Sequence, residues 1–361
     1  MKKTFLDYFP VPRFLKKPLV GIDLSDQVIK FAELGGSNIE GLSLRAIGRR
    51  ELPQGVLAAG EIKNKEVLIQ KLSEIKNEFG FEVVAVALPE EKSYFVKLRL
   101  PHMKKMDLRG SIELQLEEHV PVSPKELYFD YEILKEPENE NGWYEIGVSS
   151  VIKAVVESYI EVFKKSGFKL FAFEVEPQSI GRALIERNDP KAYMILDIGK
   201  MRTGFTVISD DIVWFNATVP FGGDTITKAI EKGLNINYAE AEELKISIGF
   251  SSDPAAKQIY DALVPPLASL KDELKRRLIF WQTHKEEESG ERKKIEKVIL
   301  SGGQAGMPGL KAYLATSLGV EVVIANPWTN IFSFENIIPD MFQEEALTYA
   351  VALGLALRQY D

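Results

Sequence analysis

The chain has 361 residues, of which 45% are hydrophobic and 27% are charged, with a formal net charge of −8. At ~150 residues per domain this predicts a globular protein of two or three lobes, and the acidic balance argues against a general nucleic-acid binder, because affinity for a polyanion comes mainly from Lys and Arg. The absence of cysteine excludes disulfide frameworks, thiol catalysis, iron–sulfur clusters and cysteine-ligated zinc, and three scattered histidines disfavour a histidine metal centre.

The chain is expected to be cytoplasmic, without a transmembrane segment. A membrane-spanning helix needs ~20 apolar residues, and the longest candidate, 346–357, is shorter and interrupted by Thr348 and Gly354. The N-terminal arm, 1–17, meets Asp7 and two prolines and lacks a signal-peptide core. We expect this arm to pack on its own domain or on a neighbouring molecule, with a membrane-surface anchor as the alternative.

The first part of the chain predicts a buried sheet. Residues 19–25 and 28–34 are predicted to form two strands around a tight turn, and 67–79 carries apolar residues at helical spacing. The continuous apolar run 83–88 is typical of a strand buried on both faces, and therefore of an α/β sheet.

Residues 93–170 change in character and predict a small α+β subdomain inserted into a larger domain. Its predicted elements are a strand at 94–100, a helix at 106–119, strands at 128–134 and 143–150, a helix at 153–165 and a strand at 169–173.

The remaining residues predict a second sheet with its own helices. The predicted elements are paired strands at 193–199 and 204–208, a helix at 267–281, a strand at 297–303 that runs into glycines, and a helix at 345–358.

An internal repeat relates the two sheets. Residues 21–31 and 195–205 each combine a buried strand, an Asp, a tight turn and a return strand, which suggests two similar lobes facing each other. Each turn can aim N–H groups at phosphate oxygens, and Asp23 and Asp197 can each hold hydrated Mg²⁺. A turn-capping Asp is the alternative for each hairpin. In a third motif, 298–310, two glycines follow a strand, which lets the backbone pass close to a ligand. The alternative is a tight turn that contacts no ligand.

These motifs resemble those of two protein groups. Asp23, Asp197-Ile-Gly199, Glu176-Pro177 and Leu300-Ser-Gly-Gly303 resemble the actin–Hsp70–sugar-kinase ATP-binding superfamily, while 93–170 is similar to the extra subdomain of the FtsA family. The resemblance implies an α/β, actin-like (ribonuclease H-like) two-lobed ATPase fold with an FtsA-like inserted α+β subdomain. A narrower resemblance, to the PilM family of type IV pilus assembly proteins, rests on Phe221–Lys228, Ala239–Lys245, Leu270–Trp281 and Ile299–Gly303.

The family's organisation implies five units. They are the arm 1–17; subdomain IA, formed by 18–92, 171–190 and 335–361; the inserted subdomain IC, 93–170; subdomain IIA, formed by 191–221 and 262–334; and subdomain IIB, 222–261.

The resemblance also implies an ATP site with bound Mg²⁺. The implied residues are Asp23 and Ser25 at the first phosphate loop; Asp197, Gly199, Lys200 and Thr203 at the second, with Asp23 and Asp197 as metal ligands; Gly222, Gly223 and Asp224 opening a helix of the smaller lobe; Glu242 and Lys245 at the ribose or adenine edge; and Gly302, Gly303 and Met307 beside the adenosine. Glu176 matches the position that orients the attacking water in some bacterial actins, with a helix-capping role as the alternative. For Glu242 and Lys245 the alternative is a solvated helix pair.

Two departures from the family pattern bear on hydrolysis. Lys200-Met201-Arg202 replaces small residues in the second loop, and these side chains either crowd the γ-phosphate or place a cation on the phosphates. Asp26 adds a negative charge in the first loop, and at ~4 Å with an effective dielectric constant of ~20 that charge is worth about 4 kcal/mol. We therefore expect ATP binding with weak or no hydrolysis.

The implied function is a scaffold of the type IV pilus assembly machine, recruited to the inner face of the inner membrane. The resemblance implies that it docks the cytoplasmic N-terminal peptide of the inner-membrane protein PilN between the first domain and the inserted subdomain, with nucleotide state biasing lobe closure and partner affinity. The alternatives are an active ATPase or phosphotransferase, although the chain has no Asp-rich sugar loop, and a filament former related to FtsA or GspL. Self-association is compatible with each reading.

Overall fold

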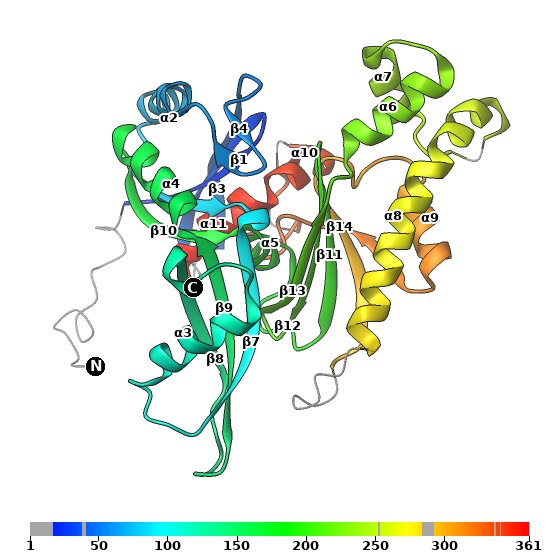
Figure 1. The fold of residues 1–361 in the computed structure, drawn as a ribbon. Helices are drawn as coiled ribbons and strands as arrows, with labels where there is room; N and C mark the ends of the chain where they lie inside the picture. Colours follow the sequence, from blue (N-terminus) through cyan, green and yellow to red (C-terminus); the bar gives the residue numbers. More distant parts are fainter. Residues whose placement is uncertain are drawn as a thin grey trace.

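The computed structural model describes residues 17–37, 41–251, 253–283, 292–335, 337–339 and 341–360 (Figure 1). The predicted arm lies outside the described residues except for Lys17, and so do residues 284–291.

The first sheet has the strand order β10-β6-β1-β2-β3. Strands β1 and β2 form the predicted antiparallel hairpin, whereas β6 runs parallel to both β1 and β10. Helices α2 and α4 cover one face, and α5 and α11 cover the other. The strand bounds are β1 (Leu19–Ser25), β2 (Val28–Ser37), β3 (Gly41–Glu51), β6 (Val83–Leu88) and β10 (Lys169–Val175), and the helix bounds are α2 (Lys65–Phe79), α4 (Lys153–Lys165), α5 (Glu176–Leu184) and α11 (Ala350–Leu357).

Alternation along β1 explains how the sheet separates its two faces. Val20 and Ile22 pack into the core beneath α2 and α4, so Gly21 and Asp23 lie on the opposite face. A Cβ atom at Gly21 would lie 2.0 Å from the Ala352 carbonyl oxygen, so only glycine lets α11 approach β1 this closely. Asp23 therefore projects from the face that carries α5 and α11.

The second sheet repeats the order of the first, as β13-β12-β11-β14-β15. Strands β11, β12 and β13 are antiparallel neighbours, and β14 runs parallel to β11 and β15. This order matches β3-β2-β1-β6-β10, and the two-lobed α/β architecture predicted from the duplicated hairpin is confirmed. The bounds are β11 (Ala192–Ile198), β12 (Thr203–Ser209), β13 (Ile212–Val219), β14 (Ile295–Ser301) and β15 (Glu321–Ile324).

Four helices belong to the second lobe, within the described part of the chain. Helices α6 (Gly223–Leu234) and α7 (Tyr238–Ser247) form a small unit at its top, while α8 (Lys257–Thr283) and α9 (Leu310–Leu318) pack beside the sheet (Figure 1). Helix α8 begins ten residues before the predicted 267, because a buried leucine stripe continues through the paired prolines Pro265 and Pro266. The proposed IIB–IIA boundary after residue 261 falls inside this helix.

The inserted segment forms a separate antiparallel sheet of order β7-β9-β8, with helix α3 packed against it. Its core is its own, built from Leu98, Ile112, Leu116 and Ile146, all 0–1% exposed. The bounds are β7 (Ser93–Pro101), α3 (Leu108–His119), β8 (Leu127–Lys135) and β9 (Trp143–Ile152), close to those predicted.

The sequence prediction missed three strands of the two large sheets and misread the C-terminus. Strands β3, β13 and β15 lack a clear pattern; every residue of β13, for example, is half-buried and so shows no alternation. The helix predicted at 345–358 is interrupted into α10 (Gln343–Ala346), η5 (Leu347–Tyr349), α11 and η6 (Arg358–Tyr360). The short elements elsewhere are β4 (Leu57–Ala58), β5 (Glu61–Ile62), η2 (Glu90–Lys92), η3 (Pro124–Glu126) and η4 (Pro254–Ala256).

None of the helices that the structure describes combines the length and apolar character needed to cross a membrane. The division into subdomains IA, IC, IIA and IIB remains our proposal for how these elements group.

Candidate functional site

The two predicted aspartates come from different lobes and interact electrostatically. Asp23 lies near the end of β1 and Asp197 near the end of β11, the corresponding strands of the two sheets. The negative charge of Asp23 acts on both Asp197 and Glu176, so carboxyl groups from both lobes share one electrostatic environment. Lys30, the antiparallel partner of Asp23 on β2, places its Nζ 3.6 Å from the Asp23 carboxylate.

This crowding shifts the protonation of the acids. Burial raises the pKa of Asp197 to about 6, against the opposing charge of Lys30, and the charge of Asp23 raises it further. Burial also raises the pKa of Glu176 well above its ordinary range, and Asp23, Glu90 and Asp197 add to that effect. Glu176 is the first residue of α5 and Val175 is its N-cap, so Glu176 does not occupy the capping position. Because four carboxyl groups lie near one another, binding of a cation beside them, in addition to Lys30, is electrostatically favourable.

Two residues of this cluster were missed from the sequence. Lys30 was detectable in principle, because the predicted hairpin register places it opposite Asp23. Glu90 follows β6 and carried no sequence signal. Its Oε1 accepts a hydrogen bond from Asn216 Nδ2 at 3.1 Å, which joins the first lobe to β13 of the second.

The protonation of Glu90 makes a testable prediction about stability. Burial raises the pKa of Glu90 from 4.5 to about 7, although hydrogen bonds from Asn216 and Thr218 oppose the shift. The folded protein therefore keeps a proton up to about pH 7 that the unfolded chain has already lost, and the free energy of unfolding falls as pH rises from about 4.5 to 7. We expect Glu90→Gln to remove about 3 kcal/mol of this decrease. Urea titrations between pH 5 and 8 measure the free energy of unfolding. If it falls with pH in Glu90→Gln as steeply as in the unaltered chain, the assignment is contradicted.

The second loop is held by the first turn of α6. Gly199 N–H donates to the Arg202 carbonyl at 2.9 Å, while the N–H groups of Gly223 and Asp224 donate to the carbonyls of Gly199 (2.9 Å) and Lys200 (2.8 Å). A Cβ atom at Gly222, the residue before α6, would lie 2.5 Å from the Lys200 carbonyl oxygen. The predicted residues 222–224 thus fix the loop itself.

Two predicted hydroxyl groups also bond within the protein. Thr203 Oγ1 donates to the Phe221 carbonyl at 2.7 Å, and Ser25 Oγ donates to the Val28 carbonyl at 3.1 Å. The structure therefore places both side chains where they stabilise the turns.

The side chains of the two loops meet between the lobes. Lys200 Nζ donates to Gln27 Oε1 at 2.7 Å, and Arg202 forms ion pairs with Asp26 at 3.0 Å and with Glu91. The long side chains of the second loop are thus directed at the first loop, and Asp26 lies against a cation.

Glu242 and Lys245 do not form a solvated pair, because Lys245 is 2% exposed. Lys245 Nζ lies 2.8 Å from Glu242 Oε2 and donates to Thr227 Oγ1 at 3.0 Å, and Thr227 in turn bonds Glu242 at 2.5 Å. Burial lowers the pKa of Lys245, and the Glu242 carboxylate opposes that effect. These contacts tie α7 to the first turns of α6, where Asp224 forms an ion pair with Lys228 at 2.7 Å.

The glycines after β14 lie beside Asp197. Gly302 has φ +81°, and a Cβ atom there would lie 2.7 Å from Asp197 Oδ1, so both its conformation and its surroundings require glycine. At Gly303 the nearest atom to a Cβ would be Thr348 Cγ2, at 3.6 Å. Met307 is buried, and its N–H donates to the Gln304 carbonyl at 3.0 Å.

A metal ion would need ligands beyond this chain. Among the described residues, no group of three or more Asp, Glu, His or Cys side chains is arranged to hold one. Mg²⁺ commonly takes one or two carboxylates and completes its shell with phosphates and waters. The Asp23–Asp197 pair fits that pattern, since a cation would offset the burial and the repulsion by Asp23 that raise the pKa of Asp197.

A groove of about 1050 Å³ lies between the inserted sheet and the two large sheets. Strands β8, β10 and β13 each stand at the edge of their sheet, with no further strand beyond them among the described residues. All three edges line the groove, through 128–132 of β8, 171–175 of β10 and 212–214 of β13.

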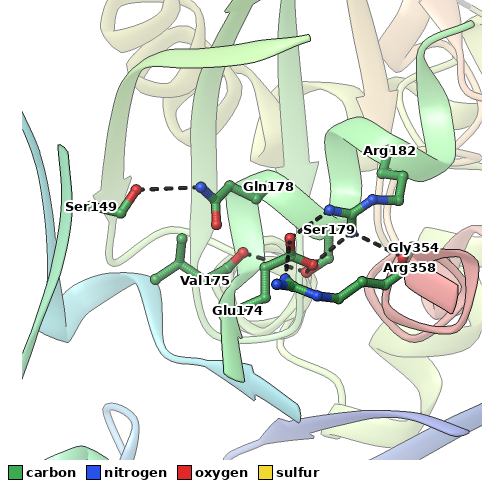
Figure 2. A network of polar contacts seen from close by, with 8 residues as sticks. All are labelled: Ser149, Glu174, Val175, Gln178, Ser179, Arg182, Gly354 and Arg358. Atoms are coloured by element: carbon green, nitrogen blue, oxygen red, sulfur yellow. Dashed lines mark hydrogen bonds and ion pairs between the residues drawn. The ribbon is translucent and has the colours of Figure 1, made fainter. Parts of the chain in front are cut away.

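A buried ion network supports the floor of this groove (Figure 2). Glu174 of β10 accepts two bonds from Arg182 of α5, at 2.5 and 2.6 Å, and a third from Arg358 at 3.0 Å. From the same helix, Gln178 Nε2 donates to Ser149 Oγ of β9 at 3.3 Å. The network thus joins β10, α5 and the C-terminal segment to the inserted sheet.

The sequence model of a family described as "Type IV pilus assembly protein PilM" matches residues 21–360 of this chain. The chain belongs to the PilM family. The resemblance inferred from its motifs is therefore confirmed.

Solved structures agree with this membership. The structure described as "PilM-PilN type IV pilus biogenesis complex" is 25% identical with a TM-score of 0.77, covering 95% of this chain and 98% of that one. MreB5 of Spiroplasma citri bound to ADP is 15% identical with a TM-score of 0.55, covering 94% and 95% of the two chains, and shares the fold. The actin-like fold predicted from the sequence is thus confirmed for this PilM-family chain.

A curated relative supports the FtsA-like character of the chain. Cell division protein FtsA of Bacillus subtilis (strain 168) is 21% identical over 189 residues, which are 48% of this PilM-family chain and 43% of FtsA. The match spans less than half the length of FtsA.

Proposed function

We propose that this chain is a cytoplasmic, ATP-binding scaffold of the type IV pilus assembly machine, recruited to the inner face of the inner membrane by docking the N-terminal cytoplasmic peptide of PilN. The observation that carries the proposal is the convergence of three sheet edges on one groove. The similar solved complex, which contains PilM and PilN, supports the choice of partner.

The groove suits an extended peptide. Edge strands present backbone N–H and C=O groups that a peptide strand can pair with, and side-chain pockets between them supply specificity. The walls provide such pockets, through Phe95 and Val96 of β7, Phe173 of β10 and Trp214 of β13. The proposed peptide extends along β8 or β10 and inserts alternate side chains between these groups.

The nucleotide site is proposed at the facing hairpins. Asp23 and Asp197 would hold Mg²⁺, which supplies positive charge against the phosphates, and Lys30 adds a cation from the protein. Gly302 and Gly303 bring the backbone close to Asp197, and we propose that the nucleoside lies against this backbone, with Glu242, Lys245 and Met307 nearby.

Hydrolysis at this site is proposed to be weak. Burial, and then the neighbouring carboxyl groups, raise the pKa of Glu176 well above its ordinary range, which disfavours the carboxylate form that could accept a proton from a water molecule. A bound cation counters this shift, so Glu176 would be a slow base at best.

Strand β13 supports a coupling between nucleotide and partner. Its first residues, 212–214, line the groove, whereas its last residue, Val219, pairs with Thr203 at the second loop. Midway, Asn216 bonds Glu90 of the first lobe. Lobe closure around a nucleotide would shift this strand against β8 and β10, and so change the affinity for the peptide.

Filling the groove tests the partner proposal. We expect Ala172→Trp, on the β10 edge, to weaken binding of a synthetic PilN N-terminal peptide by about tenfold or more, because the new indole occupies peptide space. Isothermal titration calorimetry with and without ADP measures the affinity, and the two nucleotide states are expected to differ by severalfold.

A matched control is Ala312→Trp, which enters a separate cavity of about 800 Å³ beside α9 and should leave peptide affinity unchanged. Absence of peptide binding by the unaltered chain in every nucleotide state would overturn the proposed partner.

A further inference from the structure

Two turns from different lobes are joined by charged and polar side chains. The β11–β12 turn sends Lys200 to Gln27, at 2.7 Å, and Arg202 to Asp26, at 3.0 Å, on the β1–β2 turn. Arg202 also forms an ion pair with Glu91 of η2. One guanidinium therefore bridges two carboxylates of the opposite lobe.

These charges are sheltered from solvent. The side chains of Arg202, Asp26 and Glu91 are 24%, 23% and 20% exposed, so water screens them less than it screens a surface pair. Arginine suits this position because its planar fork can bind two carboxylates with different nitrogen atoms. The three groups together carry a charge of −1, and without Arg202 they would carry −2.

We propose that Arg202 is a positioning residue that neutralises Asp26 and Glu91, and thereby allows the first turn to accept a polyphosphate anion. The inference rests on the proposed nucleotide site. An uncompensated Asp26 beside that site would repel phosphate oxygens, and Arg202 holds its carboxylate against the second turn. The same contact brings the two turns together before a nucleotide enters.

This role makes a prediction that depends on phosphate charge. We expect Arg202→Met to weaken ADP binding by about tenfold at low salt, with a smaller loss for AMP, because repulsion grows with the number of phosphates. High salt should reduce the loss, since the Debye length falls to ~3 Å at 1 M. Isothermal titration calorimetry with ATP, ADP and AMP at two salt concentrations measures these affinities.

Removing the opposing carboxylate separates charge from structure. Asp26→Asn alone should tighten ADP binding, and Asp26→Asn combined with Arg202→Met should recover most of the affinity lost by Arg202→Met. If Arg202 had only a structural role, Arg202→Met would weaken the binding of AMP and ADP equally, and Asp26→Asn would weaken nucleotide binding as well. Either result overturns the inference. Thermal unfolding of each variant without nucleotide identifies any that fails to fold, and Asp26→Asn then decides by itself.

The two proposals fail in different ways. If the unaltered chain binds no adenine nucleotide, the proposed nucleotide site is wrong and this inference falls with it. If the unaltered chain binds ADP and Arg202→Met binds it equally well, only the role of Arg202 is wrong.

Discussion

Replacing Asp197 with Asn is expected to weaken Mg²⁺-dependent ADP and ATP binding strongly while stabilising the nucleotide-free protein. Burial and the charge of Asp23 raise the pKa of Asp197 to about 6, so at pH 7.5 the folded protein holds a carboxylate that the unfolded chain solvates better. The neutral amide avoids this cost, and the free energy of unfolding should rise by about 1–3 kcal/mol. The same amide is a poor Mg²⁺ ligand, so affinity should fall by about 100-fold or more.

The prediction is diagnostic because nucleotide affinity should fall while the stability of the nucleotide-free protein should rise. Calorimetric titration with ADP and Mg²⁺ measures the affinity, and urea unfolding without nucleotide measures the stability. Asp261→Asn, on the exposed surface of α8, is the matched control and should change neither quantity. A variant that binds nucleotide as the unaltered chain does would refute the proposed metal site.

Replacing Glu174 with Ala is expected to cost about 3–5 kcal/mol of stability, since it leaves two arginines without their buried carboxylate. Glu174 is 5% exposed and accepts bonds from Arg182 and Arg358, which come from α5 and the C-terminal segment (Figure 2). Because the network lies under the groove, peptide affinity should fall together with stability. Urea unfolding and peptide titration of the same samples measure the two effects.

The matched control for Glu174→Ala is a surface carboxylate that also has two cationic partners. Glu161 pairs with Lys65 at 2.5 Å and Lys165 at 2.7 Å, but all three side chains are exposed to water. Glu161→Ala should therefore leave stability nearly unchanged. A small effect for Glu174→Ala as well would mean that the network adds little to the groove floor.

Local pattern was sufficient to predict the hairpins and several helices of the chain. Helix α4 has the predicted bounds, 153–165, because its apolar residues recur at helical spacing. The strand–Asp–turn repeat placed Asp23 and Asp197 on equivalent strands, and the sheets have equivalent orders. These features depend on residues close in sequence, which is why the sequence carries them.

The sequence by itself determined the duplicated α/β lobes, the family and the residue types in the two corresponding turns. Tertiary structure alone decided what those residues contact: Glu90 meets Asn216 across 126 positions, and Lys200 meets Gln27 across 173. It also decided that β13, which has no sequence pattern, completes the groove with β8 and β10. Such contacts follow from how two sheets and an insertion pack together, and spacing along the chain does not encode that geometry.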